Sequence, residues 1–222
     1  SKLADGIKSN IIDKYLVPGT GRFDNGTQSA QLFSLWYDFS PEKNKTLDVL
    51  FKEFERHNWH LSTGIYSTKM LFDVLRMNNR NDISFRIANQ KDFPGWGYMI
   101  QKGATTLWET WNLPGTVYSC NHPMFGSIDE WFYRSLLGIN GAAPGFEKII
   151  IKPQPVNELS WAKGSYQSIR GKISSEWKNE AGKFMLTVSI PPNCRAQIWI
   201  PADKQQEIKE NNSRVEILRY EN

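Results

Sequence analysis

The hydrophobic pattern of this chain changes its period part-way along, and this change limits the fold more than any other feature. Up to about residue 92 the apolar residues recur every three or four positions, as on one face of a helix. After residue 145 they alternate with polar residues, as in a strand. A chain of 222 residues is long enough for one large or two small cores. The sequence therefore predicts an α plus β protein with a helical domain at 1–144 and an all-β domain at 145–222.

Six helices are expected in the first domain. Their predicted ranges are 4–17, 27–39, a segment that starts at Ser40-Pro41, 65–77, 82–90 and 127–138. Ser40 is interpreted as an N-cap with a proline at the first helical position. Ser127 and Glu130 are interpreted as a capping box that opens the last helix.

Strands are expected in two places. Residues 97–101 and 104–108 are predicted as a strand pair joined at Lys102-Gly103. In the second domain the predicted strands are 148–152, 165–169, 172–177, 184–190, 196–200 and 215–218. Turns at such short spacing favour a β-sandwich.

Composition excludes several classes of protein. The net charge is +4, but Lys and Arg are scattered, so we expect no nucleic-acid partner. Cys120 and Cys194 stand far apart in different predicted domains, which argues against a disulfide and a metal site, and no cofactor-binding motif is present. No apolar run reaches membrane-spanning length. The chain starts at Ser1-Lys2, which we interpret as a cut piece, so a missing signal peptide says nothing about the parent protein.

The segment from Gly103 to Trp111 holds the strongest catalytic candidate. It places Glu109 between Trp108 and Trp111. Tryptophan faces bind sugar rings, and a carboxylate is the group that hydrolyses glycosidic bonds. Glu109 is therefore a candidate general base, with a structural glutamate paired to a Lys or Arg as the alternative.

Further polar and aromatic candidates surround this motif. His122 and Asn121 could hydrogen-bond sugar hydroxyls, or could be a packed loop histidine and a turn former. His60 precedes a predicted helix, in a loop expected at a ligand-binding end of the domain. Asn25 and Gln28 stand at the start of the second helix, where a turn and an N-cap explain the segment equally well.

Trp96 lies in the same aromatic-rich region as Trp108 and Trp111. It could stack on a sugar or close the core, and we favour the pocket, because tryptophans that cluster in a loop-rich segment suggest a lined cavity. These three indoles are therefore grouped with His60, Asn121 and His122 as candidate substrate-binding residues.

These motifs resemble bacterial α-L-rhamnosidases, which are inverting glycoside hydrolases built on an (α/α)6 toroid. The resemblance covers nearly the whole chain and is carried by residues 24–28, 60–64, 94–99, 103–111, 121–122, 125–126, 144–147, 149–154 and 171–177. It implies the second half of the catalytic barrel followed by a jelly-roll-like β-sandwich. It also implies that Glu109 is the general base and that His122 contacts the sugar.

The resemblance further implies that part of the active site lies outside this chain. The general acid of the family is a Glu in an Asp-rich motif in the earlier half of the barrel, and no segment here matches that motif. The expected partners are therefore a rhamnose-containing glycoside or polysaccharide and the missing N-terminal half of the barrel. The isolated chain is expected to be inactive, since inversion requires two carboxylates.

Two other functions remain open from the sequence. The first is another (α/α)6 glycoside hydrolase or a phosphorylase, which a phosphate requirement would distinguish. The second is a carbohydrate-binding module without catalysis, whose sugar affinity would survive Glu109→Gln. The sequence also leaves localisation open. A periplasmic or extracellular parent is favoured because bacterial enzymes of this type are often exported, with the cytoplasm as the alternative.

Overall fold

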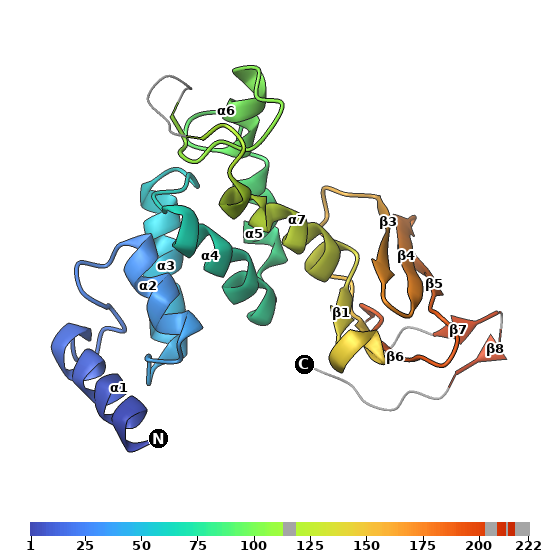
Figure 1. Ribbon diagram of the computed structural model, residues 1–222, viewed down its shortest axis with the longest axis horizontal. Helices are drawn as coiled ribbons and strands as arrows, with labels where there is room; N and C mark the ends of the chain where they lie inside the picture. The colour runs from blue at the N-terminus through green and yellow to red at the C-terminus, as the bar shows by residue number, and fades with distance from the viewer. Residues whose placement is uncertain (113–118, 203–207, 212, 216–222) are drawn as a thin grey trace. The chain divides into compact units, whose positions relative to one another are not determined.

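The computed structural model describes residues 1–112, 119–202, 208–211 and 213–215, which form two compact units. The helical unit is Ser1–Phe132 and the strand unit is Tyr133–Asn222. Figure 1 shows the helices in blue to olive and the strands in yellow to red. The predicted boundary was 144/145, whereas the units divide at 132/133, because strand β1 (Ile139–Gly141) already pairs with β2 (Lys148–Ile151).

The helical unit is built from short helices joined by loops. Its helices are α1 (Lys2–Tyr15), α2 (Gln28–Trp36), α3 (Lys43–Arg56), α4 (Ile65–Met77), α5 (Asn81–Ala88), α6 (Trp96–Gln101), the 3-10 turn η1 (Pro123–Gly126) and α7 (Ser127–Trp131). Thr27 caps α2 by accepting a hydrogen bond from the backbone N–H of Ala30. α2 packs against α3 and α4, and each of the three helices has a fully buried leucine: Leu32, Leu50 and Leu71. This packing confirms the helical period read from the sequence.

The predicted strand pair at 97–101 and 104–108 is wrong. Residues 96–101 form helix α6, and residues 104–108 are irregular. Trp96 and Met99 are both buried, which is the i, i+3 spacing of one helix face. A run of six residues is too short for apolar spacing to separate a helix from a strand.

Two predicted helix starts also differ. α3 begins at Lys43, and Ser40 instead accepts a hydrogen bond from the Glu42 N–H and bonds the Thr46 hydroxyl. Ser127 opens α7 without capping it, because the 3-10 turn η1 leads directly into the helix. After α7 the chain continues as a π-helical turn, η2 (Phe132–Leu136), and reaches Gly138 in a left-handed conformation.

The strand unit contains two three-stranded sheets. The first has the order β1-β2-β6, in which β6 (Arg195–Ile198) runs parallel to β2. The second is an antiparallel meander of β3 (Trp161–Ser168), β4 (Gly171–Glu180) and β5 (Lys183–Ser189). β7 (Lys209–Glu210) and β8 (Ser213–Arg214) form a further pair. The strand predicted at 215–218 lies almost wholly outside the described residues.

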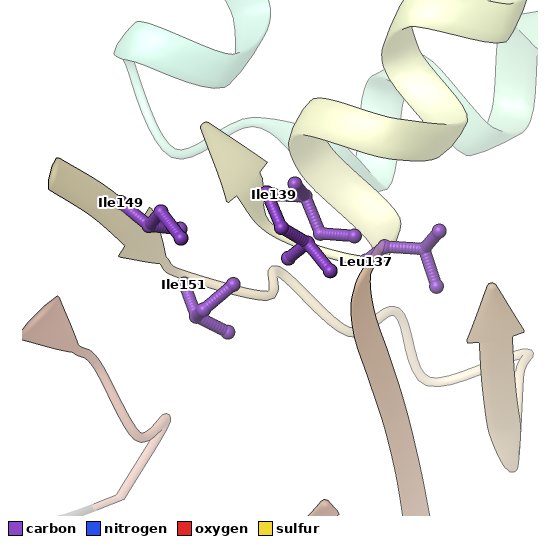
Figure 2. Packing of buried hydrophobic residues seen from close by; sticks show 5 residues of the cluster. Leu137, Ile139, Ile149 and Ile151 are labelled. Carbon is purple, nitrogen blue, oxygen red and sulfur yellow. The ribbon is translucent and has the colours of Figure 1, made fainter. Parts of the chain in front are cut away.

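An aliphatic cluster forms the core of the strand unit. Figure 2 shows the side chains of Leu137, Ile139, Ile149 and Ile151 gathered together, and Ile173 of β4 completes the cluster. The predicted alternation on β5 is confirmed, because every second residue from 184 to 190 is shielded while those between are exposed. Two layered sheets with a shared core fit the predicted sandwich.

Within the described ranges, no helix is both long enough and apolar enough to cross a membrane.

Candidate active site

Two chain segments that carry the strongest candidates run side by side in the helical unit. We call residues 106–111 the Glu109 segment and residues 119–126 the His122 segment. The His122 N–H donates to the Leu107 carbonyl at 2.9 Å, and the Glu109 N–H donates to the Ser119 carbonyl at 3.0 Å. The Thr106 hydroxyl donates to the Cys120 carbonyl. These bonds bring Glu109 and His122, thirteen positions apart in sequence, onto neighbouring stretches of backbone.

Glu109 is half-buried, so part of the residue is accessible to solvent. Among the described residues its carboxylate makes neither a hydrogen bond nor an ion pair, so the alternative of a structural salt bridge finds no partner there. By contrast, Glu53 in α3 has a guanidinium partner, Arg56. The side-chain hydrogen bond from Arg56 holds the pKa of Glu53 below its usual value. An unpaired, partly shielded carboxylate is suited to accept a proton.

The ring of His122 is oriented by its own backbone. Its Nδ1 accepts a hydrogen bond from the Met124 N–H at 3.4 Å, and this contact caps η1. Because Nδ1 is an acceptor, the proton of the neutral ring sits on Nε2. Nε2 of the half-buried His122 is therefore an N–H donor, while the neighbouring Asn121 side chain is exposed and its backbone N–H donates to Ser119 Oγ.

The three tryptophans of this region are buried. Trp96, Trp108 and Trp111 expose only 6%, 3% and 9% of their surface. The indole N–H of Trp96 donates to the Phe125 carbonyl, and that of Trp111 donates to the Thr63 carbonyl, both at 3.0 Å. Both donors are already used within the protein, so these two rings act as packed supports of the two segments.

His60 lies in the loop between α3 and α4, residues 57–64, which we call the His60 loop. Its Nδ1 lies 3.0 Å from the Asn58 carbonyl, so it carries the ring proton. Its Nε2 is buried and has no partner among the described atoms. Asn58 and Trp59 both have positive φ, which is unusual for a bulky residue, and the Arg86 guanidinium covers the Trp59 ring at 3.9 Å.

Gln28 has a role that sequence reasoning missed. Its side chain is fully buried; its amide donates to the His60 carbonyl and accepts from the Ser62 N–H, both at 2.9 Å. It therefore clamps the His60 loop from the first turn of α2. The only sequence signal was a glutamine directly after a capping threonine, whereas the loop that it binds lies 32 residues away.

No group of three or more His, Cys, Asp or Glu side chains in the described part of the chain is arranged to hold a metal ion.

The match to known proteins decides the family. Residues 1–136 match the bacterial alpha-L-rhamnosidase 6 hairpin glycosidase domain, and residues 138–214 match the bacterial alpha-L-rhamnosidase C-terminal domain. This chain belongs to the bacterial α-L-rhamnosidase family. The membership confirms the predicted resemblance and fold class, and it places this rhamnosidase-family chain among the glycoside hydrolases.

Individual relatives agree along most of this rhamnosidase-family chain. An alpha-L-rhamnosidase of Streptomyces avermitilis is 35% identical over 87% of this chain, and one of Alteromonas sp. is 36% identical over 90%. The crystal structure of the S. avermitilis enzyme complexed with L-rhamnose superposes with a TM-score of 0.84 over 91% of this chain. The structure of the alpha-L-rhamnosidase from Dictyoglumus thermophilum gives 0.89 at 35% identity over 96%. The chain spans only 20% and 22% of the two curated relatives, and 20% and 25% of the two solved chains.

Proposed function

We propose that this chain is the C-terminal part of an enzyme that hydrolyses terminal α-L-rhamnosides with inversion, and that Glu109 is the general base. The observation that carries the proposal is the backbone pairing of the Glu109 and His122 segments, which brings a carboxylate-bearing and an imidazole-bearing stretch of chain side by side. The family membership and the alpha-L-rhamnosidases that align with 84% to 90% of the chain support rhamnosides as the substrate class.

In this mechanism Glu109 removes a proton from a water molecule that attacks the anomeric carbon. His122 donates its Nε2 proton in a hydrogen bond to a sugar hydroxyl, and the exposed Asn121 amide makes a second polar contact. His60, Trp96, Trp108 and Trp111 form the supporting wall around these groups. An inverting enzyme also needs a general acid roughly 6.5–9.5 Å from the base, so that water fits between base and sugar.

We further propose that the general acid comes from a preceding half of the same barrel. The curated relatives are about five times longer than the segment they share with this chain. Helix α1 supports the idea, because it buries none of its residues although Leu3 and Ile7 are large and apolar. A missing half of the barrel would cover that face. The isolated chain is therefore expected to be inactive.

The test is the rate of aryl α-L-rhamnoside hydrolysis by the full-length polypeptide with Glu109→Gln. A general base contributes about 10²–10⁴-fold, so kcat should fall by that factor while rhamnose binding persists. Glu55→Gln, an exposed glutamate on α3, is the matched control and should keep the wild-type rate. An unchanged rate in Glu109→Gln would assign the base elsewhere.

The same assay separates the competing functions. A carbohydrate-binding module would bind sugar with or without Glu109 and would never cleave it, even in the full-length polypeptide. A phosphorylase would require inorganic phosphate for turnover. Hydrolysis by the isolated chain would show that both carboxylates lie within these residues.

A further inference from the structure

Trp111 joins three separate parts of the helical unit. Its indole N–H donates to the carbonyl of Thr63 at 3.0 Å, and both residues are at least nine-tenths buried. One ring face stacks on Phe125 with centroids 3.9 Å apart, and Trp96 meets the ring edge-on at 5.1 Å. Since one ring face is stacked, the donor is used and only 9% of the surface is exposed, Trp111 has little surface to offer a sugar ring.

The acceptor of this hydrogen bond is itself held in place. Gln28 clamps the backbone on either side of Leu61, and the Thr63 hydroxyl bonds the Thr68 hydroxyl at 2.8 Å. Thr63 O is therefore a point fixed by α2 and by the first turn of α4. The hydrogen bond from Trp111 to Thr63 O therefore fixes the Glu109 segment relative to α2 and α4.

That segment carries the base. Trp111 stands two residues after Glu109, and its stacking partner Phe125 stands three residues after His122. At the other end, the Leu107–His122 backbone bond holds the two segments together. The Glu109 segment is thus fixed on both sides of the carboxylate, by backbone pairing before it and by the Trp111 indole after it.

We propose that Trp111 is a positioning residue, which sets the Glu109 carboxylate relative to the His60 loop and the His122 segment. The proposal rests on Glu109 being the base. Misplacing a reacting group by about 1 Å costs on the order of 10²-fold in rate. Losing the indole donor leaves Thr63 O buried without its partner, so the segment should shift to recover a hydrogen bond.

The first experiment compares Trp111→Phe with Trp131→Phe in the full-length polypeptide. Phenylalanine keeps the stack on Phe125 but removes the donor. Trp131 is an equally buried control in the same unit, since its N–H bonds Asn81 at 2.6 Å and its ring stacks on Phe72. We expect Trp111→Phe to lower kcat by about 10–100-fold with KM changed less than about threefold. Trp131→Phe should change kcat by less than about threefold.

A double mutant tests whether Trp111 acts through Glu109. If it does, adding Trp111→Phe to Glu109→Gln should lower the remaining rate by less than about threefold, because the group that it positions is already disabled. A full additional 10–100-fold loss would overturn the proposal. A rise in KM at constant kcat would also overturn it, because Trp111 would then be a substrate contact. An equal loss of kcat in Trp131→Phe would overturn it too, because the effect would then come from general packing.

Amide hydrogen exchange tests the positioning role of Trp111 without relying on the catalytic rate. Trp111→Phe should raise exchange in the Glu109 and His122 segments, while Glu109→Gln should not. If Glu109→Gln leaves the rate unchanged, the proposed function fails, and the exchange data still decide whether Trp111 holds the segments. Phe125→Leu is the second variant, for the case that Trp111→Phe does not fold: it keeps the indole donor, removes the ring stack and should lower kcat in the same direction.

Discussion

The helical unit and the strand unit use buried polar side chains in different ways. In the helical unit, glutamine amides and indole N–H groups reach distant loops and hold them, as Gln28 does for residues 60–62. In the strand unit the core is an aliphatic layer, and Ser175 and Trp177 bond only the carbonyls of the entering segment, at Leu137 and Leu136. Buried polar side chains of the helical unit thus hold loops, whereas those of the strand unit hold the segment that enters the sheet, whose register follows from strand pairing and alternation.

Gln31 holds a second loop by the same kind of interaction as Gln28, a buried side-chain amide bonded to loop backbone. It lies one helical turn after Gln28 on α2 and is also fully buried. Its amide accepts from the Phe23 N–H at 3.1 Å and donates to the Phe23 carbonyl at 3.0 Å. Both glutamines replace the hydrogen bonds that a neighbouring strand would supply, so one helix face organises two separate loops.

The largest expected stability effect concerns the aliphatic core of the strand unit. Ile151→Ala removes a fully buried side chain of the strand-unit cluster and should cost about 3–4 kcal/mol of unfolding free energy. Ile198, its register partner on β6, is 48% exposed, so Ile198→Ala should cost less than about 1 kcal/mol. Hydrogen exchange resolved by unit should place the loss in residues 133–202. A loss of protection spread equally over both units would contradict the idea that this cluster stabilises the strand unit in particular.

The second largest expected effect concerns the buried side-chain hydrogen bonds that hold the loops of the helical unit. Gln31→Met has a similar volume but leaves the buried Phe23 N–H without its partner, while the Phe23 carbonyl keeps the Gly26 N–H, so the change should cost about 1–2 kcal/mol. The loss should appear in urea unfolding and as faster exchange around residue 23. Gln101→Met, at an exposed position at the end of α6, is the control and should be close to neutral. If both variants are equally stable, side-chain clamps do not hold the loops of the helical unit.

The smallest effect concerns charge at the packing of α2, α4 and α7. Burial lowers the pKa of Lys69, but hydrogen bonds and charges from Glu130 and Asp73 outweigh it and raise the pKa overall. The stabilisation is therefore complete below the unfolded pKa, about 10.4, and is lost as pH rises through the higher folded pKa. Since the side chain is about one-third exposed, this stabilisation is below about 1 kcal/mol.

The stability difference between wild type and Lys69→Met should shrink above about pH 10.4. A constant difference would assign the effect to the contact of Lys69 with Trp36 instead.

The elements with strong periodicity were predictable, and the short ones were not. The apolar spacing of α3 and α4 and the alternation on β5 specify their structures, because each buries one whole face. Residues 96–101 were mistaken for a strand because six residues fit both periods. The caps at Ser40 and Ser127 failed because their hydroxyls face other partners or none, which depends on neighbouring segments.

For the site, the sequence by itself determined the residue types and their grouping: a carboxylate between tryptophans, and a histidine and an amide a loop later. It also determined that the chain divides into helices and strands, since the two periods cannot share one element. Only the tertiary structure decided what those residues do. It turned Trp96 and Trp111 into buried donors, paired the backbone of the Glu109 segment with that of the His122 segment, and made Gln28 a clamp. Hydrogen bonds between residues tens of positions apart depend on how helices pack, and no local pattern records that packing.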